Sequence, residues 1–90
     1  MTKYPASPAS AEDRDAYEHS TDVFTVASKG VERFRYDSLT ERLFVTYITG
    51  KTYCYRDVPE EFWEQLKQAA SKGRSVNFRV KPYFDGFGPL

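Results

Sequence analysis

Hydrophobic and polar residues alternate along the middle of the chain, which is the pattern of strands that are buried on one face. The alternation occupies residues 31–36, 42–48 and 51–56, and turn-forming residues separate these segments. Gly50 fits the left-handed position of a short hairpin loop between the second and third segments. The pattern therefore predicts a three-stranded antiparallel meander.

A hairpin that turns at Gly50 also fixes the register of its two strands. It places Tyr53 opposite Val45 and Tyr55 opposite Leu43, so the strands share one apolar face. The predicted members of that face are Phe34, Tyr36, Leu43, Val45, Tyr47, Tyr53 and Tyr55.

The hydrophobic period becomes helical after the strands. Residues 59–71 carry apolar side chains at helical spacing, Pro59 suits the first turn, and Gly73 suits a C-terminal stop. A shorter amphipathic stretch covers residues 75–81. We therefore expect an α+β fold in which one long and one short helix cover the apolar face of the meander.

The N-terminal part of the chain has a different composition. Residues 1–22 are rich in Ala, Ser, Pro and acidic residues and show no apolar period, so they are predicted to form a flexible acidic tail. Residues 23–90 would then form a single domain. The chain has 13 basic and 13 acidic residues, but residues 1–27 carry two basic and five acidic ones, which leaves the domain basic.

The composition also limits the chemistry that is available. Cys54 is the one cysteine, so an internal disulfide and a cysteine-built metal site are not expected. No apolar run approaches the roughly 20 residues that cross a bilayer, and the N-terminus lacks the apolar segment of a secretory signal. We expect a cytoplasmic protein without a membrane contact, a metal or a cofactor.

The sequence Gly50-Lys51-Thr52 matches the end of a nucleotide-binding P-loop. That motif needs a further glycine five residues before Gly50, and position 45 is Val. It also needs a helix after the threonine, where the pattern predicts a strand. We therefore interpret Gly50 as a hairpin residue rather than as part of a phosphate site.

Several short motifs occur in an order that resembles one protein family. The motifs are an Asp-Ser turn after Tyr36, a strand ending at Gly50, the pair Tyr53-x-Tyr55, Val58-Pro59 before a helix, and a segment ending in Gly73. Over about residues 26–84 the chain resembles the KTSC domain, which is named for the C-terminus of some lysyl-tRNA synthetases and also occurs in small bacterial and phage proteins. The resemblance implies an α+β fold and suggests RNA binding, and it implies no catalytic residue.

Two regions are candidates for binding nucleic acid. Arg33, Arg35 and Phe44 fall on the face of the sheet opposite the apolar one, where basic residues around an exposed aromatic could bind single-stranded RNA. The alternative is an ordinary solvated sheet face. The second region, residues 65–84, contains no acidic residue and carries the basic residues Lys67, Lys72, Arg74, Arg79 and Lys81. Cations that stabilise a helix C-terminus would account for part of this set.

The sequence does not contain the parts of a typical enzyme site. It has neither a nucleophile paired with histidine nor a phosphate loop, so we expect no catalytic activity. We predict a small binding module that binds RNA through its basic C-terminal segment. The alternative is a protein–protein interaction module, such as a phage-type or bacterial-type inhibitor or adaptor.

Overall fold

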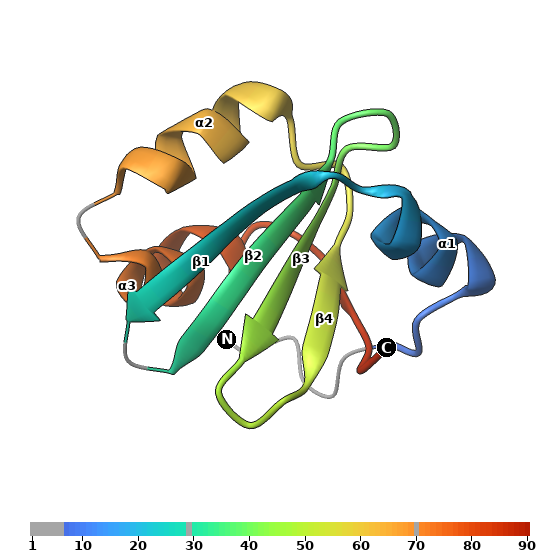
Figure 1. The fold of residues 1–90 in the computed structure, drawn as a ribbon, viewed down its shortest axis with the longest axis horizontal. Coiled ribbons are helices and arrows are strands. Elements are labelled where there is room, and N and C mark those ends of the chain that lie inside the picture. The colour runs from blue at the N-terminus through green and yellow to red at the C-terminus, as the bar shows by residue number, and fades with distance from the viewer. Residues whose placement is uncertain (1–6, 29, 70) are drawn as a thin grey trace.

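A five-stranded antiparallel sheet forms the centre of the molecule (Figure 1). The computed structural model describes residues 7–28, 30–69 and 71–90, without the side chains of residues 26–28 and 72. The strands follow the order β1-β2-β3-β4-β5. Their bounds are Asp22–Ser28 for β1, Val31–Asp37 for β2, Arg42–Tyr47 for β3, Thr52–Tyr55 for β4 and Gly86–Phe87 for β5.

The antiparallel sheet is confirmed, and the register predicted between its second and third segments is found between β3 and β4. Val45 pairs with Tyr53, and Leu43 pairs with Tyr55. Gly50 has a φ of 92° in the loop between β3 and β4, so it occupies the left-handed conformation that favours glycine. The sheet is nevertheless wider than predicted, because β1 and the short strand β5 add one strand at each edge.

The inner face of the sheet is covered by α2 (Glu60–Gln68), α3 (Lys72–Ser75) and the π-helix η1 (Val76–Val80). Trp63 of α2 is fully buried there and stacks on Tyr36, with ring centroids 5.3 Å apart. The Trp63 indole donates a hydrogen bond to Asp22, and the Tyr36 hydroxyl donates one to the Val58 carbonyl at 2.6 Å. The polar atoms of these two buried rings are therefore both hydrogen-bonded.

The helices differ in length from the prediction. The long helix ends at Gln68 rather than at residue 71, because Ala69 adopts an extended backbone with a ψ of 139°. The second helical stretch begins at Lys72 rather than at residue 75, so Gly73 lies inside α3 and is not a helix stop. This early turn places Val76 and Val80 in the core, where both are buried.

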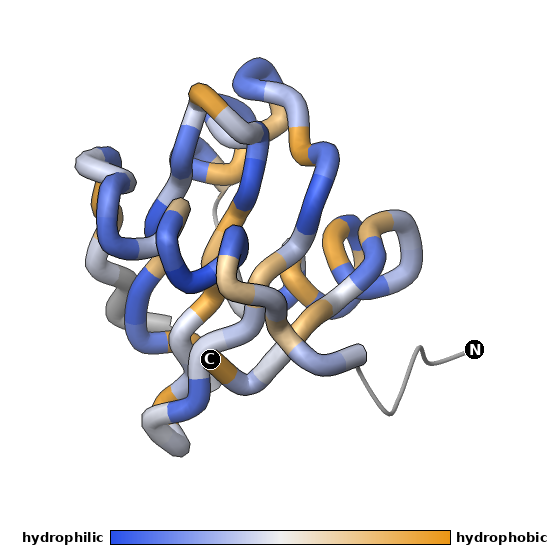
Figure 2. Tube along the Cα trace, turned by 90° about the vertical axis from the view of Figure 1, so that its right-hand side faces the viewer, coloured by the Kyte–Doolittle hydropathy of each residue, from blue (hydrophilic) through white to orange (hydrophobic). Residues whose placement is uncertain are grey.

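The prediction of a flexible tail is wrong for residues 7–22. Helix α1 (Ala11–His19) lies on the outer face of the sheet, opposite α2 (Figure 1). Ser10 and Asp13 form a capping box at its start, which is the sequence signal for a helix N-terminus. Figure 2, which faces the side of the molecule where α1 lies, shows hydrophilic and hydrophobic positions mixed along the chain.

Truncation of the inner core should be costly. Leu66 is 2% exposed within the cluster around Trp63, so we expect Leu66→Ala to lower the free energy of unfolding by about 2–5 kcal/mol. Lys51→Ala is the control, because Lys51 is exposed at the β3–β4 hairpin and should shift stability by less than about 0.5 kcal/mol. Urea unfolding measures both, and two equal midpoints would contradict this core.

Candidate binding surfaces

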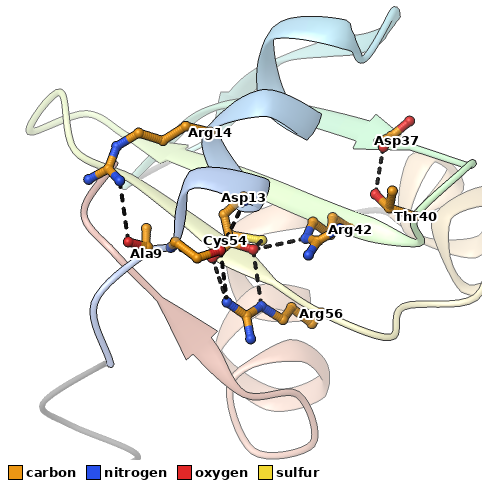
Figure 3. Close-up of polar contacts among 9 residues, drawn as sticks. Ala9, Asp13, Arg14, Asp37, Thr40, Arg42, Cys54 and Arg56 are labelled. Atoms are coloured by element: carbon orange, nitrogen blue, oxygen red, sulfur yellow. Dashed lines mark hydrogen bonds and ion pairs between the residues drawn. The ribbon is translucent and has the colours of Figure 1, made fainter.

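The carboxylate of Asp13 lies buried between two arginines of the outer sheet face (Figure 3). Arg42 Nε is 2.8 Å from Oδ1 of this carboxylate. Arg56 makes two contacts, from Nε to Oδ1 at 3.0 Å and from Nη2 to Oδ2 at 2.7 Å. Such a two-point guanidinium–carboxylate pair is among the strong hydrogen-bonded contacts in proteins.

The capping box holds this carboxylate in position from the side of α1. The Ser10 N–H donates to Oδ2 of Asp13 at 2.9 Å, and the Asp13 N–H donates to the Ser10 hydroxyl at 3.2 Å. The Cys54 thiol donates to Oδ1 at 3.6 Å. Asp13 therefore caps the N-terminus of α1 and also binds two arginines of the outer face.

The two titratable groups at this position have opposite pKa shifts. Burial by itself raises the pKa of Asp13, but hydrogen bonds from Arg56, the Ser10 N–H and Arg42 outweigh it and hold the pKa well below its ordinary value of 3.8. Burial, followed by the negative charge of Asp13, raises the pKa of Cys54 to about 12. At neutral pH the carboxylate is therefore ionised and the thiol is neutral.

Three further contacts fix α1 and Arg56 against the sheet. The guanidinium of Arg56 lies 3.5 Å above the ring of Phe87 in β5. Arg35 donates to the carbonyl oxygens of Tyr17 and Ser20 at 3.4 and 2.9 Å, and so binds the C-terminal end of α1. The ring of Tyr17 meets Phe44 edge-on, with centroids 5.2 Å apart. We define the outer docking face as the sheet residues that receive α1, which are Arg35, Arg42, Phe44, Cys54 and Arg56.

The proposed RNA face at Arg33, Arg35 and Phe44 is not an open surface. Phe44 has 0% exposure because α1 covers it, so the expectation of an exposed aromatic there is wrong. Arg35 is bound to α1, and Arg33 pairs with the neighbouring Glu32 at 3.5 Å. Residue spacing along β2 and β3 placed these side chains on the correct face but gave no indication of what covers it.

A hollow of about 290 Å³ opens beside Arg56. It is lined by Arg56, Asp57, Tyr83, Phe84, Asp85 and Phe87. Two carboxylates stand in its lining next to one guanidinium, so the hollow does not present the uniformly basic surface that a phosphate backbone requires.

The structure divides the basic segment into residues with different surroundings. Lys67 is paired with Glu64 at 3.2 Å and with Asp22 at 3.9 Å, so it belongs to the edge of the core. Arg74 and Arg79 are exposed, whereas the side chain of Lys72 lies outside the described residues. Lys81 is half-buried, with its ammonium group 5.3 Å from the ring centroid of Tyr47.

Phe78 is a surface residue of η1, in the stretch that was expected to form the short amphipathic helix. It is 65% exposed, because Val76 and Val80 of η1 point into the core and Phe78 lies between them on the opposite side. The guanidinium of Arg74 lies 5.9 Å from its ring centroid. Arg79 lies 5.4 Å from the ring of Phe62 and donates to Gln65. We define the α3–η1 surface as Arg74, Phe78, Arg79 and Lys81.

The fold and sequence together identify the family. The KTSC domain family matches residues 27–84, so the chain belongs to this family. A protein from Tsukamurella paurometabola is 41% identical over 59 residues, which cover 66% of this chain and 88% of the relative. The crystal structure of a KTSC domain protein from Yersinia pestis is similar to this fold with a TM-score of 0.67 and 28% identity, and the match covers 72% of this chain and 92% of that chain.

The family match divides the molecule in an informative way. It includes the outer docking face and the inner core, but α1 and β5 both lie outside residues 27–84. Within the described part of the chain, no three or more His, Cys, Asp or Glu side chains are grouped to hold a metal ion. None of the described helices is long and apolar enough to cross a membrane.

Cys54 can report on the contact of Asp13 with the sheet, because it is the one cysteine and is fully buried beneath α1. Asp13→Asn removes the charge between two guanidinium groups, which should weaken the docking of α1 by about 1.5–3 kcal/mol. Labelling of Cys54 by a thiol reagent should therefore accelerate by about 10- to 150-fold. The control is Asp15→Asn on the same helix, whose side chain is 75% exposed; equal labelling rates in both variants would contradict the role of Asp13.

The same carboxylate predicts a specific acid sensitivity. Because the pKa of Asp13 is lowered on folding, its stabilising contribution is present above its unfolded pKa of 3.8 and is lost as the pH falls. The difference in unfolding free energy between the wild type and Asp13→Asn should shrink from about pH 5 to about pH 2. Urea unfolding at a series of pH values measures this difference. A difference that stays constant across the series would show that Asp13 is not the titrating group.

Proposed function

We propose that this protein is a small non-catalytic binding module that binds single-stranded RNA through the α3–η1 surface. The observation that carries the proposal is Phe78, an exposed aromatic ring with the guanidinium of Arg74 beside it. Both residues lie in a segment of the chain, residues 65–84, that has no acidic residue.

The chemistry of the α3–η1 surface fits an unpaired nucleotide strand. An exposed ring can stack on a base, and such stacking contributes about 1–3 kcal/mol per base. Arg74 and Arg79 each face an aromatic ring, a contact that orients the cation without neutralising it. Their charges can therefore attract a phosphate backbone.

Lys67 and the sheet face around Phe44, which were both first considered for RNA binding, contribute little to this proposal. Lys67 is engaged by Glu64 and Asp22, and the face around Phe44 is covered by α1. The α3–η1 surface specifies where the ligand would bind.

Fluorescence anisotropy with a labelled single-stranded RNA over a salt series tests the proposal. Phe78→Ala should weaken binding by about 5- to 150-fold, the equivalent of one lost base stack. Arg74→Glu combined with Arg79→Glu should abolish binding at low salt, because phosphate contacts dominate the affinity and its salt dependence.

Two variants serve as matched controls for this experiment. Ile48→Ala removes a similarly exposed apolar side chain, 67% exposed, from the β3–β4 hairpin. Arg14→Glu reverses an exposed charge on α1, on the opposite side of the sheet. Both should bind RNA like the parent protein. Equal losses in the controls and the α3–η1 variants, or no RNA binding at low salt, would reject the proposed function.

A further inference from the structure

The outer docking face is shaped and charged to receive a helix. Arg42 and Arg56 bind a carboxylate from the first turn, and Arg35 binds main-chain carbonyl groups at the last turn. Between these ends, Phe44 and Cys54 contact Ala16 and Tyr17. The face thus recognises both ends of a short helix as well as the side chains in its middle.

The contact with α1 rests on few buried groups. Only Asp13 and Ala16 are buried among the nine residues of α1. A helix of this length is marginal in water when it is isolated, so α1 depends on docking for its structure. Elements with little buried apolar area open at a lower free energy than the core does. We therefore expect α1 to separate from the sheet at a lower free energy than α2, which buries Trp63 and Leu66.

The face also has supporting contacts besides those with Asp13. Arg56 is held over the ring of Phe87, and the strands that carry Arg42 and Phe44 are central strands of the sheet. The fit of α1 is also incomplete, since Arg35 Nε is buried and has no hydrogen-bond partner among the described residues. A pre-formed face with an unused donor can accept a ligand other than α1.

We propose that the outer docking face binds an acidic helix of a partner protein, and that α1 occupies this face in cis until the partner displaces it. The required helix has the chemistry of α1, with Ser-x-x-Asp at its start and a small residue followed by an aromatic one a turn later. The family match supports this view, because it contains the whole face and excludes α1. This surface is separate from the α3–η1 surface, so the proposal does not depend on RNA binding.

A protein helix fits this face better than a nucleic acid does. Arg35 donates to the carbonyl oxygens of Tyr17 and Ser20. The last carbonyl groups of a helix have no partner within the helix, so a helix C-terminus offers such acceptors. The single carboxylate of Asp13 fills the space between Arg42 and Arg56 and is fully buried there.

The test uses the full chain and a labelled peptide with the sequence of residues 7–20. Asp13→Asn and Ala16→Arg open the face in two independent ways, by loss of charge and by steric clash, and accelerated Cys54 labelling verifies the opening. Trp63, the one tryptophan, verifies by its fluorescence that the core remains folded. We expect the peptide to bind the opened variants at least tenfold more tightly than the wild type and to protect Cys54 again.

Matched peptides and variants make the result specific. The same peptide with Asp13→Asn should bind the opened chain at least tenfold more weakly. Replacing Arg42 and Arg56 of the opened chain by alanine should remove this difference in affinity between the two peptides. No peptide binding to a chain whose Cys54 is accessible would overturn the proposal. So would a dimer of the opened variant with Cys54 protected, which would make a second copy the occupant, or tighter binding of single-stranded RNA than of the peptide.

Discussion

The buried carboxylate of Asp13 is the contact on which the arrangement of both chain ends depends. It joins the first turn of α1 to Arg42 and Arg56 in the sheet. Arg56 in turn lies on Phe87 of β5, and Ser7, just before α1, bridges to the same Phe87. Removing Asp13 would leave the guanidinium groups of Arg42 and Arg56 without their counter-charge. The loss of stability would then exceed that of the hydrogen bonds alone.

The two faces of the sheet are covered by different physical means. On the inner face, Trp63 and the side chains around it exclude water over a continuous apolar cluster. On the outer face, the cluster of buried apolar residues in the described part of the chain consists of Ala16, Phe44 and Cys54. Ionic contacts with Asp13 provide the other attachment of α1 to the sheet. Apolar burial is cumulative and has no direction, whereas an ionic contact needs one geometry. The inner helices therefore depend on cumulative apolar burial, and the position of α1 depends on the geometry of a few ionic contacts.

The sequence predicted the structure correctly for the strands whose hydrophobic and polar residues alternate. Alternation located β2, β3 and β4, and Gly50 located the hairpin between β3 and β4 and gave its correct register. It missed α1 because the buried positions of that helix are an aspartate and an alanine, which form no apolar stripe. The capping box at Ser10 and Asp13 was the available signal. No local pattern, however, pairs Asp13 with arginines 29 and 43 residues further along the chain.

A chain with no net charge can still present a basic surface, and the contacts of its arginines show how. Arg42 and Arg56 are neutralised by the carboxylate of Asp13 and add nothing to the external field. Arg74 and Arg79 instead rest against aromatic rings, which attract a cation through their quadrupole and carry no compensating charge. The two pairs of arginines thus differ in their partners, a carboxylate for Arg42 and Arg56 and aromatic rings for Arg74 and Arg79. Overall composition hides this difference, since it counts charges without regard to their partners.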